Sequence, residues 1–143
     1  MTGDPRRPRL VPELLCSSLD ESLRFYTELL GFRVRYCRPE ERFAYLEREG
    51  AELMLEEPGL TRVWLTGPLQ RPFGRGINLQ IQIGDVDALY QHVLEAGITP
   101  FLSIEERWYR AEAEVLGNRQ FIVQDPDGYL LRFYEDLGRR ATG

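Results

Sequence analysis

Two stretches of the chain repeat the same succession of hydrophobic and polar patterns. In the first, the apolar residues at 10–16 predict a strand, and apolar residues at helical spacing follow it. Ser18 and Glu21 match a capping box, which favours a helix start at this point. Gly31 is suited to end the helix because glycine readily adopts the left-handed conformation there.

Three further strands are predicted after this helix, at 32–38, 42–49 and 51–57. A looser stretch at 58–76, rich in glycine and proline, then separates the two copies of the pattern.

The second copy begins with the clean alternation of aliphatic and polar residues at 77–83, which is typical of a half-buried strand. Asp85 is a good N-cap for a helix that ends at Gly97. Strands are then predicted at 99–110, 119–125 and 129–135, with a tight turn over Asp125-Pro126-Asp127-Gly128. The tail at 137–143 is expected to fray.

The predicted fold class is therefore α+β, with two βαβββ modules in one domain, at about 9–57 and 77–135, joined by 58–76. A four-stranded sheet covered on one face by a helix leaves its other face free. Two such units side by side can form a curved mixed sheet with a ligand-binding crevice.

Alternation along each strand assigns side chains to the helix-covered face or to the open face. On the helix side we expect Leu10, Leu14, Cys16, Leu53, Leu55, Ile77, Leu79, Ile81, Ile83, Leu131 and Phe133. The open-face residues, with aromatics that lie nearby along the chain, make the candidate ligand-binding set. It comprises Glu13, Phe43, Tyr45, Met54, Trp64, Asn78, Gln80, Trp108, Phe121, Arg132 and Tyr134. For any single member, a solvated face or a packed core is the ordinary alternative role.

Composition limits the function. The 143 residues carry a net charge of −5, which gives no general attraction for nucleic acid. Every basic residue except the single histidine is arginine, so lysine chemistry is excluded.

No apolar run approaches the ~20 residues of a membrane span, and the first residues do not resemble a secretion signal, so we expect a cytoplasmic protein. Cys16 and Cys37 are expected to be buried or half-buried thiols, and His92 to lie on a solvated helix surface.

Three motifs in order resemble the vicinal oxygen chelate superfamily, which includes glyoxalase I, extradiol dioxygenases and the fosfomycin- and bleomycin-resistance proteins. They are SLDESLRFYTELLGFRV at the first helix, INLQIQIGDVDALYQHVLEAGI at the second, and QFIVQDPDGYLLRF at the closing hairpin. The resemblance covers about residues 9–135.

The resemblance also implies where a metal would be held in the enzymes of that superfamily. Its ligand positions match Val11, Asn78, Arg132 and either Glu52 or Glu56 in this sequence. Valine cannot coordinate, arginine repels a divalent cation, and asparagine is a poor ligand for zinc or iron. We therefore expect no metal, no cofactor and no catalytic residue.

The bleomycin-resistance branch fits best. The resemblance implies a homodimeric protein that sequesters a cationic or aromatic small molecule, such as a bleomycin-class drug, in a crevice between two subunits. Aromatic faces and carboxylates suit such a ligand, whereas Arg132 suits a carboxylate or phosphate instead. A glyoxalase- or dioxygenase-like enzyme, and a regulatory module with an empty crevice, remain the alternatives.

Overall fold

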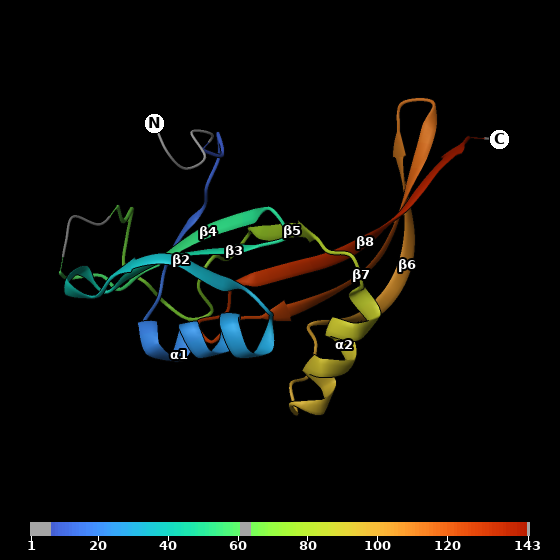
Figure 1. The fold of residues 1–143 in the computed structure, drawn as a ribbon. Coiled ribbons are helices and arrows are strands. Elements are labelled where there is room, and N and C mark those ends of the chain that lie inside the picture. Colours follow the sequence, from blue (N-terminus) through green and yellow to red (C-terminus); the bar gives the residue numbers. More distant parts are fainter. Residues whose placement is uncertain (1–6, 61–63, 143) are drawn as a thin grey trace, which may run out of the picture.

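A computed structural model describes residues 7–60 and 64–142, and it consists of two four-stranded mixed sheets with one helix against each (Figure 1). The first module contains β1 (Glu13–Leu15), α1 (Leu19–Arg24), a π-helical turn (Phe25–Leu29), β2 (Arg33–Arg38), a 3-10 turn (Pro39–Glu41), β3 (Phe43–Arg48) and β4 (Ala51–Glu56). The second contains β5 (Asn78–Gln82), α2 (Val86–Glu95), β6 (Leu102–Ala111), β7 (Glu114–Gln124) and β8 (Leu130–Ala141).

The two sheets have the same topology, with strand orders β1-β4-β3-β2 and β5-β8-β7-β6. In each, the first strand runs parallel to the last, and the remaining pairs are antiparallel. The predicted α+β fold with two βαβββ modules is confirmed.

Both helices begin where the capping residues predicted. Ser18 Oγ accepts a hydrogen bond from the Glu21 amide at 3.2 Å, and Asp85 Oδ1 accepts one from the Ala88 amide at 3.0 Å. Each side chain satisfies an amide that has no partner within its own helix. Gly31 and Gly97 follow the helices with positive φ, as predicted.

Alternation places most of the core correctly. Leu53, Leu55, Leu131 and Phe133 are buried beneath the helices. The prediction is wrong for Leu10 and Ile77, which are 86% and 51% exposed because each precedes the first paired residue of its strand.

The predicted fraying of the C-terminal tail is also wrong for residues 137–141, whereas Gly143 lies outside the described residues. β8 continues to Ala141, which pairs with Glu114, so β6, β7 and β8 form an arm that projects beyond α2 (Figure 1). Arg139 pairs with Glu114 at 3.2 Å, and the Arg140 guanidinium lies 3.8 Å from the Trp108 ring centroid. These cross-strand contacts hold the end of β8 in place, although its glycine and charged residues suggested a frayed terminus.

The closing turn of the second module is inserted into the first. Asp125 is buried and accepts a hydrogen bond from the Tyr26 hydroxyl at 2.8 Å. Asp127 is buried too, and accepts hydrogen bonds from the Ser17 amide and hydroxyl. Burial is the main cause of a raised pKa for Asp125, although the hydrogen bonds it accepts oppose the shift.

No helix in the described part of the chain is long and apolar enough to cross a membrane.

Candidate ligand-binding site

Both helices lie on the same side of the sheets, so the opposite side of each sheet is left open (Figure 1). These open faces carry most of the predicted site residues, but they divide them into two groups of different chemistry. The first sheet presents carboxylates and aromatic rings with arginines packed on them. The second presents amides, tyrosines and arginines together with two acidic residues, Glu105 and Asp136.

On the first sheet, register aligns one row of side chains across four strands. Glu13 is opposite Met54, Met54 is opposite Tyr45, and Tyr45 is opposite Tyr36. Three of these four residues belong to the predicted set, and the structure brings them together.

Two of the predicted aromatic residues are less accessible than the sequence suggested. Phe43 and Tyr45 are both buried, although they lie outside the helix-covered core. The Tyr36 ring stacks beside Tyr45 with centroids 5.0 Å apart, and the Arg38 guanidinium lies 3.9 Å from the Phe43 centroid. Tyr36 is therefore the exposed ring of this group, at 46% exposure.

The carboxyl groups of this face are held close together. Burial raises the pKa of Glu13, and a hydrogen bond with Glu56 and the charge of Glu56 raise that pKa further. Glu52 accepts hydrogen bonds from the Tyr45 hydroxyl at 2.6 Å and from Arg35 at 2.8 Å. The charge of Arg38 opposes this rise, so Glu13 and Glu56 form a hydrogen-bonded pair of carboxyl groups near an arginine.

A hollow of about 290 Å³ lies beside this row. Glu13, Leu15, Trp64 and Tyr129 line it together with the segment at 65–69. Trp64 is 70% exposed, and its place beside Glu13 puts an indole and a carboxyl at one site.

A second hollow, of about 370 Å³, lies on the open face of the second sheet. Its lining includes Gln80, Arg132 and Tyr134 from the predicted set. A neighbouring hollow of about 430 Å³ shares Arg132 and adds Asn78. The Arg132 Nε donates a hydrogen bond to Asn78 Oδ1 at 3.2 Å, and the Tyr134 hydroxyl donates one to Gln82 Oε1 at 3.1 Å.

Two predicted site residues do not lie on either open face. Phe121 is fully buried in the core, with its ring against Phe133 and Tyr90. Trp108 packs over Gly117 and under Arg140, on the opposite face of β6 from Tyr109, which lines both hollows of the second sheet.

The predicted set left out Tyr109 and Gln120, which occupy the places expected for Trp108 and Phe121. Each missed residue is the immediate neighbour of the predicted one, so alternation applied to 99–110 and 119–125 would have exchanged them. Tyr36 was missed because a bulge between Val34 and Tyr36 interrupts the alternation of β2.

The superfamily's metal does not fit the matching positions of this chain. Asn78 and Arg132 do lie together, but Arg132 donates to the one oxygen that Asn78 could offer. Val11 is an aliphatic side chain just before β1, and Glu52 already pairs with Arg35. A guanidinium inside the ligand set opposes the binding of a divalent cation.

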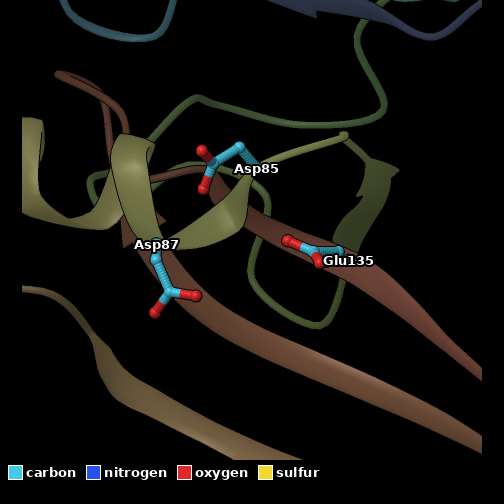
Figure 2. Close-up of side chains that lie close together, drawn as sticks. All are labelled: Asp85, Asp87 and Glu135. Carbon is cyan, nitrogen blue, oxygen red and sulfur yellow. The ribbon is translucent and has the colours of Figure 1, made fainter.

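Asp85, Asp87 and Glu135 form an acidic group near the start of α2, with their closest oxygens within 4.8 Å of one another (Figure 2). Each carboxylate already has a structural role. Asp85 caps the helix, and Glu135 accepts a hydrogen bond from the Val86 amide. Both carboxylate oxygens of Asp87 accept hydrogen bonds from the Arg119 guanidinium. The group therefore serves to anchor α2 against β7 and β8.

The thiols and the histidine offer no second centre among the described residues. Cys16 is buried, and burial raises its pKa to about 12, which makes it a poor nucleophile. Cys37 is exposed, contrary to prediction, because it lies on β2, the edge strand of its sheet, most of whose residues are exposed. His92 lies on an exposed part of α2, as predicted, with Nε2 3.3 Å from the Glu28 carbonyl oxygen.

These features define a protein with paired βαβββ modules and open sheet faces. The family model described as "Glyoxalase/Bleomycin resistance protein/Dioxygenase superfamily" matches residues 10–133, and the chain belongs to this superfamily. The predicted resemblance is confirmed.

Among the relatives of this chain, bleomycin resistance proteins of Geobacillus stearothermophilus and Staphylococcus aureus are each 26% identical over 136 residues. The match covers 89% of this chain and 96% of theirs. Among solved structures, TioX from Micromonospora sp. ML1 shares the fold with a TM-score of 0.69 and 22% identity, covering 92% of this chain and all of that one. A superfamily member from Vibrio splendidus 12B01 is 40% identical over 88% of this chain and 97% of its own, with a TM-score of 0.41.

Proposed function

We propose that this protein binds and sequesters a small molecule with an aromatic or cationic group, without chemical turnover. One observation carries the proposal: the exposed Trp64 indole and the Glu13 carboxyl line a single hollow of about 290 Å³. Aromatic faces attract planar heterocycles and cations, and a paired carboxyl adds charge to that attraction.

A bleomycin-class drug is the first ligand to test, since the relatives at 26% identity are named bleomycin resistance proteins. The net charge of −5 favours the approach of a cationic ligand over long distances. Two further hollows lie on the open face of the other sheet.

The test is a fluorescence titration with such a drug, using two matched variants. Trp64 and Trp108 are the two tryptophans, and they lie in different surroundings. Trp108→Phe is expected to keep the quenching of the native protein, whereas Trp64→Phe is expected to lose it. The absence of quenching at micromolar drug in the native protein would remove the drug assignment.

A charge variant tests the role of the carboxyl. Glu13→Gln should weaken binding of a cationic drug about ten- to a hundredfold, because a hydrogen bond to a charged group contributes roughly 1.5–3 kcal/mol. Glu40→Gln, an exposed glutamate on the 3-10 turn, is the matched control and should leave the affinity unchanged. About one metal ion per chain in the purified protein would instead favour the enzyme alternative.

A further inference from the structure

The floor of the second sheet's open face contains a buried acceptor that no described residue satisfies. Gln120 is 1% exposed, and its Nε2 donates to Glu105 Oε2 at 2.9 Å and to the Tyr109 hydroxyl oxygen at 2.6 Å. Its Oε1 is buried and has no hydrogen-bond partner. Leaving a buried polar atom without a partner is unfavourable, so a donor that reached this oxygen would be favoured.

The orientation of this amide follows from its neighbours. Turning it over would place the amide oxygen against the Glu105 carboxylate and remove the hydrogen bond between them. Nε2 therefore faces Glu105 and Oε1 is the free acceptor. Because the Tyr109 hydroxyl accepts from Nε2, its own hydrogen is available to a ligand.

Arg132 supplies a charge next to this acceptor. Its Nε donates to Asn78, while its two terminal nitrogens have no hydrogen bond or ion pair with any residue in 7–60 or 64–142. Gln120 is opposite Tyr134 in the register of β7 and β8, two residues along the strand from Arg132. Such diagonal neighbours have Cβ atoms about 7–8 Å apart, which leaves space for one small functional group.

The surrounding charges indicate what kind of anion would fit. Arg107 and Arg139 line the hollows, but so do Glu105 and Asp136, and Arg139 is paired with Glu114. Nearby carboxylates disfavour a doubly charged phosphate. A carboxylate carries a single charge and matches the planar guanidinium with two parallel hydrogen bonds.

We propose that this face binds a carboxylate with an N–H donor close beside it, as in an N-acyl amino acid or a peptide C-terminus. The carboxylate lies on the terminal nitrogens of Arg132, and the N–H donates to Gln120 Oε1. The proposal rests on the proposed small-molecule binding function and names a second ligand group for it. In this proposal, the aromatic or cationic group of the ligand still binds in the hollow beside Trp64.

Two-dimensional NMR with three small probes tests this arrangement. N-acetylglycine carries both groups, its methyl ester lacks the carboxylate, and N-acetylsarcosine lacks the N–H. At millimolar concentrations, N-acetylglycine is expected to shift the Gln120 side-chain amide and Arg132 Nε signals. The other two probes should bind about tenfold more weakly, the loss of one charged or buried hydrogen bond.

Variants assign the two contacts separately. Arg132→Gln should lose N-acetylglycine binding, whereas Arg33→Gln, on the other sheet and paired with Glu47, should retain it. Gln120→Met should bind N-acetylglycine and N-acetylsarcosine equally. The comparison of the three probes on the native protein gives the same information if that variant does not fold.

The proposal is overturned if N-acetylglycine leaves both signals unmoved, if the three probes bind equally, or if inorganic phosphate binds more tightly than N-acetylglycine. None of these results involves Trp64, so the drug titration can succeed while this proposal fails. If the drug titration fails and N-acetylglycine binds as expected, only the proposal of an aromatic or cationic ligand is rejected.

Discussion

Glu57 shows how one carboxylate outside a helix can fix where that helix starts. Its Oε2 accepts the Leu19 amide at 2.6 Å and a hydrogen bond from Arg42 at 3.0 Å. The backbone hydrogen bond is the main cause of a lowered pKa for Glu57, followed by the contact with Arg42. The helix that Ser18 caps is therefore stabilised at its start by a second side chain, Glu57, which follows β4. The sequence around the helix does not predict this contact.

Glu57→Gln should lower the free energy of unfolding near neutral pH by about 1 kcal/mol, since it removes a negative charge at a helix N-terminus. A lowered pKa in the folded state means that this stabilisation is present above the unfolded pKa of about 4.5 and is lost as the pH falls through the folded value. Urea unfolding of both proteins across this range measures the difference.

The difference between Glu57→Gln and the native protein should therefore shrink in acid. Glu95→Gln, an exposed glutamate at the end of α2, serves as the control and should show a small difference at every pH. A constant difference down to low pH would mean that the charge of Glu57 does not contribute.

Single residues were predictable where one local rule decided their environment. Ser18, Asp85, Gly31 and Gly97 have the capping and turn roles that their residue types favour. The environment of Phe121 was not predictable in this way, because an aromatic residue in a strand suits a core as well as a binding face. Only strand alternation, with Gln120 next to it, separates the two roles.

At the scale of elements, the arm made by β6, β7 and β8 was the largest departure from expectation. The sequence predicted all three strands but ended β8 near 135, whereas pairing continues to Ala141. Strand ends depend on partners distant in sequence, and the pairing of Glu114 with Ala141 has no local signal. The helices and the first sheet needed less distant information, and their predicted positions agree closely with the structure.

Gly117 permits the close packing of the arm. A Cβ at this position would lie 2.6 Å from the indole ring of Trp108, so Gly117→Ala must displace that ring. We expect a loss of about 1–3 kcal/mol in the free energy of unfolding, as for other overpacked sites. In a Trp64→Phe background, only Trp108 reports, and its emission should shift to longer wavelength as the ring is displaced.

Gly67→Ala is the matched control for this substitution, since a Cβ there meets no atom within 4 Å. It should leave both stability and the Trp108 emission unchanged. An unchanged emission in Gly117→Ala would show that Trp108 does not pack over Gly117 in solution.

At the scale of the whole molecule, the sequence predicted one crevice, and the structure shows two open faces with separate hollows. The residues of the crevice were assigned to faces with fair success, but how two sheets lie relative to each other is set by contacts such as Tyr26 with Asp125. Such contacts join residues far apart in the chain, and no periodic pattern encodes them. The division into a carboxylate–aromatic face and an arginine–amide face therefore became clear only in three dimensions.

The open faces also bear on the number of chains needed for tight binding. Ligand pockets usually bury about 70–90% of a drug-sized molecule, whereas a hollow on an open sheet face covers a ligand from one side. Apolar side chains remain exposed on this side of the single chain, namely Tyr36 on the open face of the first sheet and Trp64 in the hollow beside it. A second copy that faced these sheets would cover both the ligand and part of this apolar surface.

We therefore predict a homodimer that binds its ligand only when assembled. Light scattering at micromolar protein should give about twice the 16.7 kDa of one chain. Drug affinity, followed by Trp64 quenching, should fall on dilution through the range where the mass returns to that of one chain, because dissociation removes one wall of the site. Full affinity in a sample of single chains would show instead that one chain covers the ligand by itself.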